Sequence, residues 1–239
     1  ILIETSLVLA VTAGVFLICQ TVIYGRAPSY SEQEAEAIEP DTVIDPIWLD
    51  PYATWTRPEG PLRVGIQVGH WFAADAPDEQ EQLRVNTGAS AAGRTEWEVN
   101  LTVAKEMKTL LEAQGIVVDL LPVTIPPDYW ADAFISLHSD GNVDTSVSGF
   151  KLSAPRRDRS GKASALAEFV KTSYATETKL SWDENITPNM RGYYAFNWRK
   201  YEHSIHPMTP AIIVETGFLT NAADRRTIVA KPKTVAKGI

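Results

Sequence analysis

Hydrophobic and polar positions first follow a regular pattern at Leu62. From Leu62 to Val68 every second residue is apolar, which is the period of a half-buried strand. After a polar stretch, apolar residues recur at helical spacing between Val99 and Leu111, and Gly115 supplies a stop signal. The pattern therefore predicts a strand and then a helix at the start of a folded domain.

The alternation of strands and helices continues toward the C-terminus. Strands are predicted at Ile116–Leu121, Ala133–Leu137, Gly149–Ala154, Tyr193–Phe196 and Ala211–Val214, and a helix at Ala163–Tyr174. A further helix follows Asn221, whose side chain can cap its N-terminus. Strands that alternate with helices predict an α/β fold, in which a mostly parallel twisted sheet carries helices on both faces.

The N-terminal part of the chain has a different pattern. Ser6–Ile23 contains no charged residue and is about long enough to cross a bilayer as a helix. We therefore expect a transmembrane helix to precede the α/β domain, with residues 1–27 as a membrane anchor or an uncleaved signal. A cleavable signal peptide is the alternative, because Gly25–Ala27 resembles a cleavage site, although Pro28 follows it directly.

Residues 28–60 are predicted to form a linker, because they are rich in proline and acidic residues and show no sustained periodicity. Trp48, Tyr52 and Trp55 are expected to pack on the domain surface, with a ligand-stacking role as the less favoured alternative. The folded domain then spans residues 61–239.

Composition narrows the possible partners. The chain of 239 residues is 44% hydrophobic and 22% charged, as is typical of a globular protein. Its net charge of -8 and the lack of a run of cations argue against a nucleic-acid partner. The single cysteine, Cys19, excludes an internal disulfide and a cysteine-based zinc site. We expect a monomer.

Residues that zinc prefers follow two of the predicted strands. His70 comes just after Leu62–Val68, and His138 comes after Ala133–Leu137. Ligands of parallel α/β sheets bind outside the carboxyl ends of the strands. Two imidazoles and one carboxylate form the ligand set of an open catalytic zinc site. A further carboxylate, such as Glu215 at the end of the last strand, can accept a proton from zinc-bound water.

Taken together, four segments resemble the zinc-dependent N-acetylmuramoyl-L-alanine amidases, whose catalytic domain is called amidase type 3. The matching segments are Gly69-His70, Glu96 with Asn100-Leu101, Ser136-Leu137-His138-Ser139-Asp140, and Glu215-Thr216-Gly217-Phe218-Leu219-Thr220-Asn221. The resemblance covers about residues 62–239. Thr234–Ile239 looks like the start of the family's final helix, so we expect the C-terminus to be cut short.

The resemblance implies one Zn²⁺ per chain, held by His70, Glu96 and His138, with Glu215 as the general base. It implies hydrolysis of the bond between N-acetylmuramic acid and L-alanine in peptidoglycan. The expected location is the bacterial cell envelope, outside the cytoplasm and anchored to the membrane through Ser6–Ile23. Two alternatives remain: a zinc peptidase that acts on the stem peptide, and a non-catalytic peptidoglycan-binding module.

The chain departs from the family pattern around the first histidine. Gln67-Val68 precede Gly69-His70 where the family commonly has Asp-Pro, and Trp71-Phe72 follow it where two glycines are common. The segment Ala73–Gly93 is long and polar. We expect these departures to reshape the rim of the cleft without touching the zinc ligands. The stretch between His138 and the next predicted helix leaves no room for the inserted helix that covers zinc in some family members.

Other residues compete for the same roles. Glu98 is the alternative to Glu96, although the spacing to Asn100-Leu101 in the family favours Glu96. His203 and His206 form an H-x-x-H pair in a polar loop, where a surface role is favoured over metal binding.

A serine hydrolase built on Ser136 and Asp140 is disfavoured. Residues so close in one strand point in different directions, and the chain has no G-x-S-x-G motif.

Overall fold

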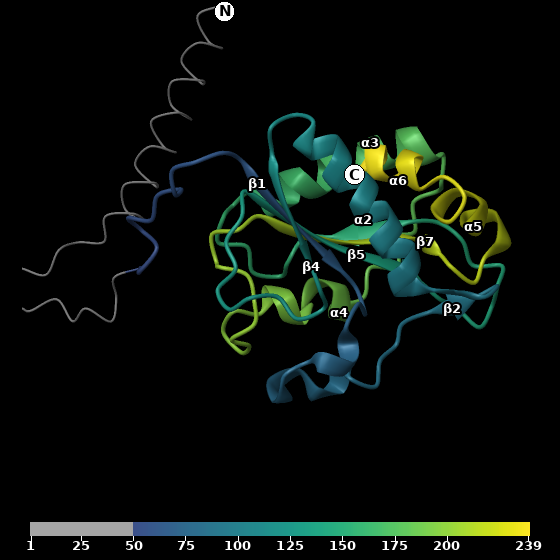
Figure 1. The fold of residues 1–239 in the computed structure, drawn as a ribbon, viewed down its shortest axis with the longest axis horizontal. Coiled ribbons are helices and arrows are strands. Elements are labelled where there is room, and N and C mark those ends of the chain that lie inside the picture. The colour runs from purple at the N-terminus through teal and green to yellow at the C-terminus, as the bar shows by residue number, and fades with distance from the viewer. Residues whose placement is uncertain (1–49) are drawn as a thin grey trace, which may run out of the picture. The chain divides into compact units, whose positions relative to one another are not determined.

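A five-stranded sheet forms the centre of the structure, a computed structural model that describes residues 50–239 (Figure 1). The strand order is β4-β1-β5-β7-β6. The strands are β1 (Arg63–Val68), β4 (Val117–Leu121), β5 (Ala133–Asp140), β6 (Lys151–Ser153) and β7 (Ala211–Phe218). The first four strands in this order pair in parallel, and β6 pairs antiparallel to β7. The predicted mostly parallel sheet is therefore confirmed.

The predicted transmembrane segment Ser6–Ile23 lies outside the described residues. Within residues 50–239, no helix combines the length and the apolar character needed to cross a bilayer. Residues Thr54–Ile239 form one compact unit, and the fold and the site described below belong to it.

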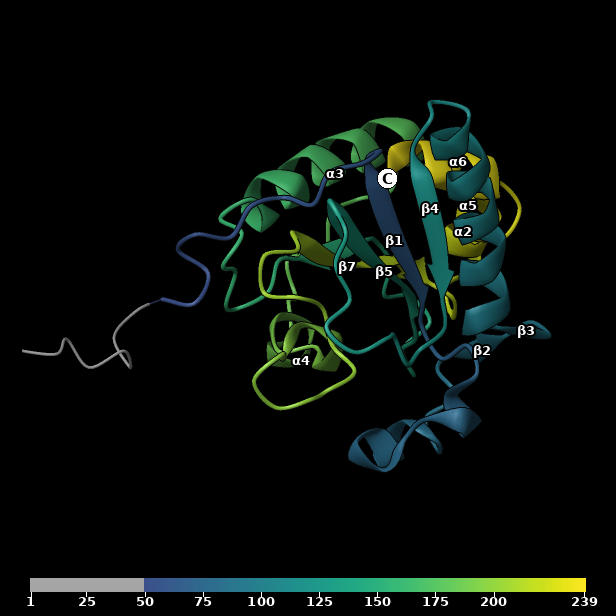
Figure 2. The ribbon, with the colours of Figure 1, turned by 60° about the vertical axis from the view of Figure 1, so that its left-hand side comes forward.

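One face of the sheet carries all the longer helices (Figure 2). They are α2 (Glu96–Glu112), α3 (Ala163–Thr178), α5 (Ala222–Ile228) and α6 (Pro232–Gly238). Alternate strand residues such as Ile66, Leu137 and Val214 pack here against Val103 of α2 and Val170 of α3 in one continuous apolar core. Burial of such side chains is the main favourable contribution to folding, at about 25 cal/mol per Å² of apolar surface.

The opposite face is covered differently from the prediction of helices on both faces. It carries the four-residue helix α4 (Pro188–Arg191), the 3₁₀ turn η4 (Tyr194–Phe196) and long loops. Phe134 and Ile213 of the sheet pack here against Phe196 and other aromatic residues. The segment between α3 and β7 is interrupted by prolines and lacks the apolar spacing of a helix. Aromatic side chains on loops therefore fill this layer.

The predicted strand at Tyr193–Phe196 is wrong. Residues 194–196 are all buried, whereas alternate residues of a half-exposed strand point to solvent. Hydrogen bonds from the Phe196 N–H to the Tyr193 carbonyl and from the Asn197 N–H to the Tyr194 carbonyl, each 2.9 Å, close a tight turn instead.

Two strands run further than the sequence pattern indicated. The sequence placed His138 and Glu215 at strand ends, but β5 continues to Asp140 and β7 to Phe218. Their pairing places His138 directly beside Glu215. Asn221 caps α5 as predicted, because its side-chain oxygen accepts hydrogen bonds from the first backbone N–H groups of that helix.

The polar segment Ala73–Gly93 forms two 3₁₀ helices and part of a small hairpin below the sheet in Figures 1 and 2. These elements are η2 (Ala73–Asp75), η3 (Asp78–Leu83), β2 (Ser90–Ala91) and β3 (Arg94–Thr95). The segment returns the chain to the start of α2, so it runs past the carboxyl end of β1. The ring of Trp55 stacks on His206 with centroids 5.5 Å apart, so its predicted packing on the domain is confirmed.

Candidate metal centre

His70, Glu96 and His138 meet at the carboxyl end of the parallel strands. One donor atom from each lies within 4.8 Å of the other two, an arrangement that could hold a metal ion. Glu96 Oε1 lies 2.9 Å from His138 Nδ1 and 3.5 Å from His70 Nε2. Residues more than 25 positions apart along the chain are thus brought together by β1, the start of α2 and β5.

Backbone geometry turns His70 toward this cluster. Its φ of 62° lies in the left-handed region, which reverses the chain directly after β1. His70 Nδ1 lies 2.8 Å from the carbonyl oxygen of Asn86. Because a carbonyl can only accept, Nδ1 carries the proton, and the lone pair of neutral His70 is on Nε2, facing Glu96. Burial lowers the pKa of His70, which favours this neutral form.

The carboxylate of Glu96 is held at both oxygens. Oε2 accepts a 2.8 Å hydrogen bond from the Ala89 N–H, and Oε1 accepts a 3.1 Å bond from the Ser139 N–H. Burial would raise the pKa of Glu96, but His138, His70 and the Ala89 N–H outweigh it, and the pKa is lowered. Glu96 is therefore an ionised, fixed acceptor that is only 4% exposed.

Glu98 has a different role. Its Oε2 accepts hydrogen bonds from the backbone N–H (3.1 Å) and the hydroxyl (2.8 Å) of Thr95. This is the capping box that opens α2. The structure thus places Glu96, and not Glu98, beside the two histidines.

His138 is held from its other side by Tyr193, a residue that the sequence analysis missed. His138 Nε2 lies 3.0 Å from Tyr193 Oη. Tyr193 Oη donates to Tyr194 Oη at 3.1 Å, and Tyr194 Oη donates to the carbonyl oxygen of Val123. Since this chain ends on a carbonyl, Nε2 must donate to Tyr193, and neutral His138 has its lone pair on Nδ1. That lone pair faces Glu96 Oε1.

The same network explains two sequence features. Gln67 donates to Tyr194 Oη at 2.9 Å and accepts from Ser136 Oγ at 2.7 Å. The departure at Gln67 therefore supplies a partner for the tyrosines beneath the site. Ser136 is fully buried and bonded to Gln67, so it has no access to a substrate and is no nucleophile.

The surroundings of His138 favour its protonated form. Burial lowers its pKa, but Tyr193, Glu96 and Glu215 together raise it well above the ordinary value. A metal ion requires the neutral imidazole, so metal binding would compete with protonation of His138.

Glu215 lies beside the three-residue cluster, and one of its two carboxylate oxygens has no hydrogen-bond partner among residues 50–239. It is in register with His138 on the neighbouring strand, so the two side chains project from the same face of the sheet. Its Oε2 is buried and has no hydrogen-bond partner within the described residues. Burial raises the pKa of Glu215 to about 8, opposed by His138 and supported by repulsion from Glu96 and Asp140.

These residues line an open cleft of about 520 Å³. The prediction that the Ala73–Gly93 segment would not touch the proposed ligands is wrong, because Asn86 and Ala89 bond to two of them. Gly88 between them has a φ of +74°, and a Cβ there would lie 2.5 Å from Glu96 Oε2. The long segment is thus part of the site, since it returns to α2 across the end of β1.

The H-x-x-H pair does not join a metal site. His203 Nδ1 pairs with Glu79 Oε1 at 2.8 Å, and His206 stacks on Trp55. Neither belongs to a group of three potential ligands among residues 50–239.

Fold and site together define an α/β protein in which three residues that could hold a metal ion line an open cleft at the carboxyl ends of parallel strands. The sequence profile of one family, Amidase_3, described as N-acetylmuramoyl-L-alanine amidase, matches residues 64–239. The chain belongs to this family of amidases.

One curated relative and several solved structures are similar to this chain. The chain is 26% identical over 216 residues to the N-acetylmuramoyl-L-alanine amidase LytC of Bacillus subtilis (strain 168), covering 85% of this chain and 35% of LytC. It thus spans about a third of that relative. The amidase AmiC2 of Nostoc punctiforme shares the fold with a TM-score of 0.52 at 20% identity, covering 76% of this chain and 94% of AmiC2. The catalytic domain of CwlV from Bacillus (Paenibacillus) polymyxa var. colistinus gives 0.50 at 19%, covering 74% and 93%.

Proposed function

We propose that this protein hydrolyses the amide bond between N-acetylmuramic acid and L-alanine in peptidoglycan with one zinc ion held by His70, Glu96 and His138. The observation that carries the proposal is the convergence of two imidazole lone pairs on Glu96 Oε1, enforced by donor bonds to Asn86 and Tyr193. Two neutral imidazoles and a carboxylate are a donor set that zinc accepts while leaving a position open.

When bound, zinc supplies Lewis acidity that polarises the scissile carbonyl and lowers the pKa of water. Glu215 accepts the proton of the attacking water and returns it to the leaving amine. Glu215 lines the same cleft as His70, Glu96 and His138, which supports this role. Asn86 and Tyr193 hold the two histidines so that their lone pairs do not rotate away.

Lys151 supports the ionised form of Glu215. It lies in register with Glu215 on β6, is 5% exposed, and forms ion pairs with Asp140 at 2.7 Å and Asp183 at 3.2 Å. Its positive charge lowers the pKa of Glu215 against the effect of burial. The pKa of Glu215 is thus kept in a range where the carboxylate can take and release a proton near neutral pH.

Digestion of purified muropeptides with identification of products tests the proposal. An amidase releases free stem peptides with an N-terminal alanine and leaves the glycan intact. Cleavage within the stem peptide would instead identify a peptidase, the first alternative. Sedimentation with peptidoglycan without any product would identify a binding module. Activity should disappear after metal removal and return with zinc.

The proposed setting is the cell envelope outside the cytoplasm, with Ser6–Ile23 as a membrane tether and the protein as a monomer. The insoluble, extracytoplasmic substrate supports this location. Flotation with lipid vesicles tests the tether: the full chain should float, and a chain without residues 1–27 should not. Flotation of both forms would remove the role assigned to this segment.

A further inference from the structure

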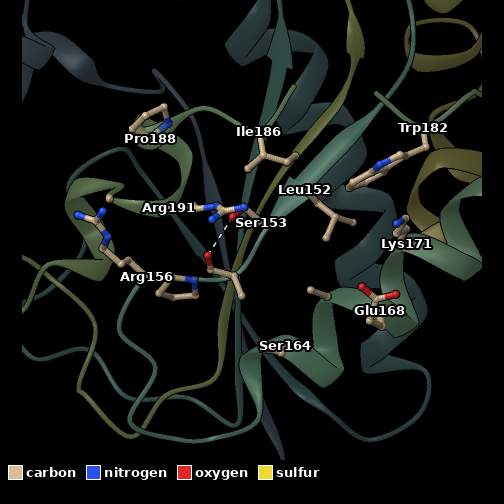
Figure 3. Close-up of a pocket in the computed structure, with 14 residues that line it drawn as sticks. Leu152, Ser153, Arg156, Ser164, Glu168, Lys171, Trp182, Ile186, Pro188 and Arg191 are labelled. Carbon is tan, nitrogen blue, oxygen red and sulfur yellow. Dashed lines mark hydrogen bonds between the residues drawn. The ribbon is translucent and has the colours of Figure 1, made fainter. Parts of the chain in front are cut away.

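A cavity away from the metal centre lies against β6, the edge strand of the sheet. It has a volume of about 690 Å³ and lies between α3 and the segment that carries α4 (Figure 3). It shares no lining residue with the cleft of His70 and Glu215. Pockets of ~300–1,000 Å³ are the size that binds small ligands in proteins.

The backbone of β6 is open toward this cavity. The Phe150 N–H donates to the Ser181 carbonyl at 2.9 Å, and the Phe150 carbonyl accepts from the Asp183 N–H at 2.8 Å, on the side away from β7. Backbone groups alternate sides along a strand, so the N–H and carbonyl of Leu152 point to the same outer side. Within residues 50–239, no backbone bond is found for Leu152 there.

The chain beside β6 leaves a gap at this position. After Asp183 it moves away from the strand, and it returns only where the Arg156 N–H donates to the Arg191 carbonyl at 2.8 Å. The outward N–H and carbonyl of Leu152 lie between these two paired positions. An unpaired edge of a sheet can accept an extended peptide as a further short strand.

Positive charge surrounds the gap, although the whole chain has a net charge of -8. The charged lining residues are Arg156, Lys171 and Arg191 against the single carboxylate of Glu168. Arg156 and Arg191 are both exposed residues, and neither forms an ion pair with the described residues. In Figure 3 the Arg191 guanidinium reaches toward Ser153, while Glu168 and Lys171 lie on the opposite wall. Lys171 Nζ lies over the ring of Trp182, 4.1 Å from its centroid.

We propose that this cavity binds a short extended peptide that carries a free carboxylate. The peptide backbone pairs with Leu152, and the carboxylate binds Arg191, whose planar guanidinium suits bidentate recognition. The stem peptide of peptidoglycan is the peptide of this kind that the enzyme would meet, and this identification rests on the proposed function. A phosphate polymer would use the cations but not the strand edge, so the geometry favours a peptide.

Calorimetry on the metal-free full chain tests the site, because metal removal separates binding from hydrolysis. The probe is a synthetic stem tripeptide, alanyl-γ-glutamyl-lysine, with free carboxylates. Arg191→Gln should weaken binding by about tenfold or more, the scale of a lost charge-assisted hydrogen bond. Arg226→Gln is the matched control, since it removes the same charge from the exposed face of α5, and it should bind like the parent.

Two altered probes separate the parts of the proposal. Amidation of both carboxylates and N-methylation of the peptide backbone should each weaken binding by about tenfold or more. Equal affinity of Arg191→Gln and the parent for the free peptide would overturn the site, as would displacement of the peptide by glycerol phosphate polymer at equal affinity. If the zinc-loaded parent bound the peptide but did not hydrolyse muropeptides, the proposed function would be contradicted and this binding site would remain.

Discussion

Replacing Glu215 with glutamine separates the catalytic and structural effects of one carboxylate. Glutamine keeps the size of the side chain and can still form hydrogen bonds, but it cannot accept a proton from water. We expect zinc-loaded Glu215→Gln to retain its metal and to lose about 10²–10⁴ of its rate on muropeptides, the usual contribution of a general base.

The same substitution should stabilise the metal-free protein at alkaline pH. The pKa of Glu215 is raised from the ordinary 4.5 to about 8, and each tenfold change in proton affinity is worth about 1.36 kcal/mol. A group whose pKa is raised on folding contributes stability below its unfolded pKa, and that contribution is lost as the pH rises through the folded pKa. The full difference is about 5 kcal/mol, and coupling to His138 reduces it, so we expect about 2–5 kcal/mol.

Urea unfolding of the metal-free proteins at pH 5, 7 and 9 measures this effect. The stability of Glu215→Gln relative to the parent should rise across the series and reach its maximum at pH 9. Glu184→Gln, which alters an exposed glutamate, should follow the parent at every pH. If Glu215→Gln were no more stable than the parent at pH 9, the carboxylate would not be buried and unpartnered as described. Parental hydrolysis by the variant would refute its role as the base.

Further substitutions at three positions, two of them with a matched control, test the metal centre. Tyr193→Phe should weaken zinc binding by about 10–100-fold, the usual effect of removing a group that orients a ligand, and Tyr201→Phe should not; a zinc titration against a competing chelator decides this. Glu96→Gln should lose zinc in the same titration, whereas Glu98→Gln should keep zinc, because glutamine also serves at this position of a capping box; the reverse result would exchange their roles. Gly88→Ala should weaken zinc binding because its Cβ would press on Glu96, and unchanged zinc affinity would show that the loop yields easily.

The spacing of apolar residues predicted most of the strands of the sheet and the helices that cover one of its faces. The alternation at Leu62–Val68 and the helical spacing at Val99–Leu111 report burial against one side of the sheet, and both elements were found where predicted. The other side could not be read in this way. Aromatic residues on irregular loops cover it, and three consecutive buried residues at Tyr194–Phe196 follow neither period.

The sequence motifs also identified only part of the site. Histidine and glutamate motifs indicate metal binding and proton transfer, so four residues could be proposed from sequence: His70, Glu96, His138 and Glu215. Tyr193 carries no such signal, because a single tyrosine in an aromatic run is ordinary core material. Tyr193 lies beside His138 because it directly precedes the turn η4 and because β5 pairs with β7 in a particular register. The pattern of apolar residues specified neither feature.

The departures around the first histidine acquire a physical role once the hydrogen bonds are followed. A histidine that binds a metal must direct the lone pair of one ring nitrogen toward the ion and keep its proton on the other ring nitrogen. His70 meets this condition through Asn86 in the long polar segment, and His138 meets it through Tyr193 and, beneath it, Gln67. Both supports come from parts of the chain that differ from the family pattern or carry no motif. The ligands can therefore follow the family motif while their supports vary, provided that each histidine keeps an acceptor behind it.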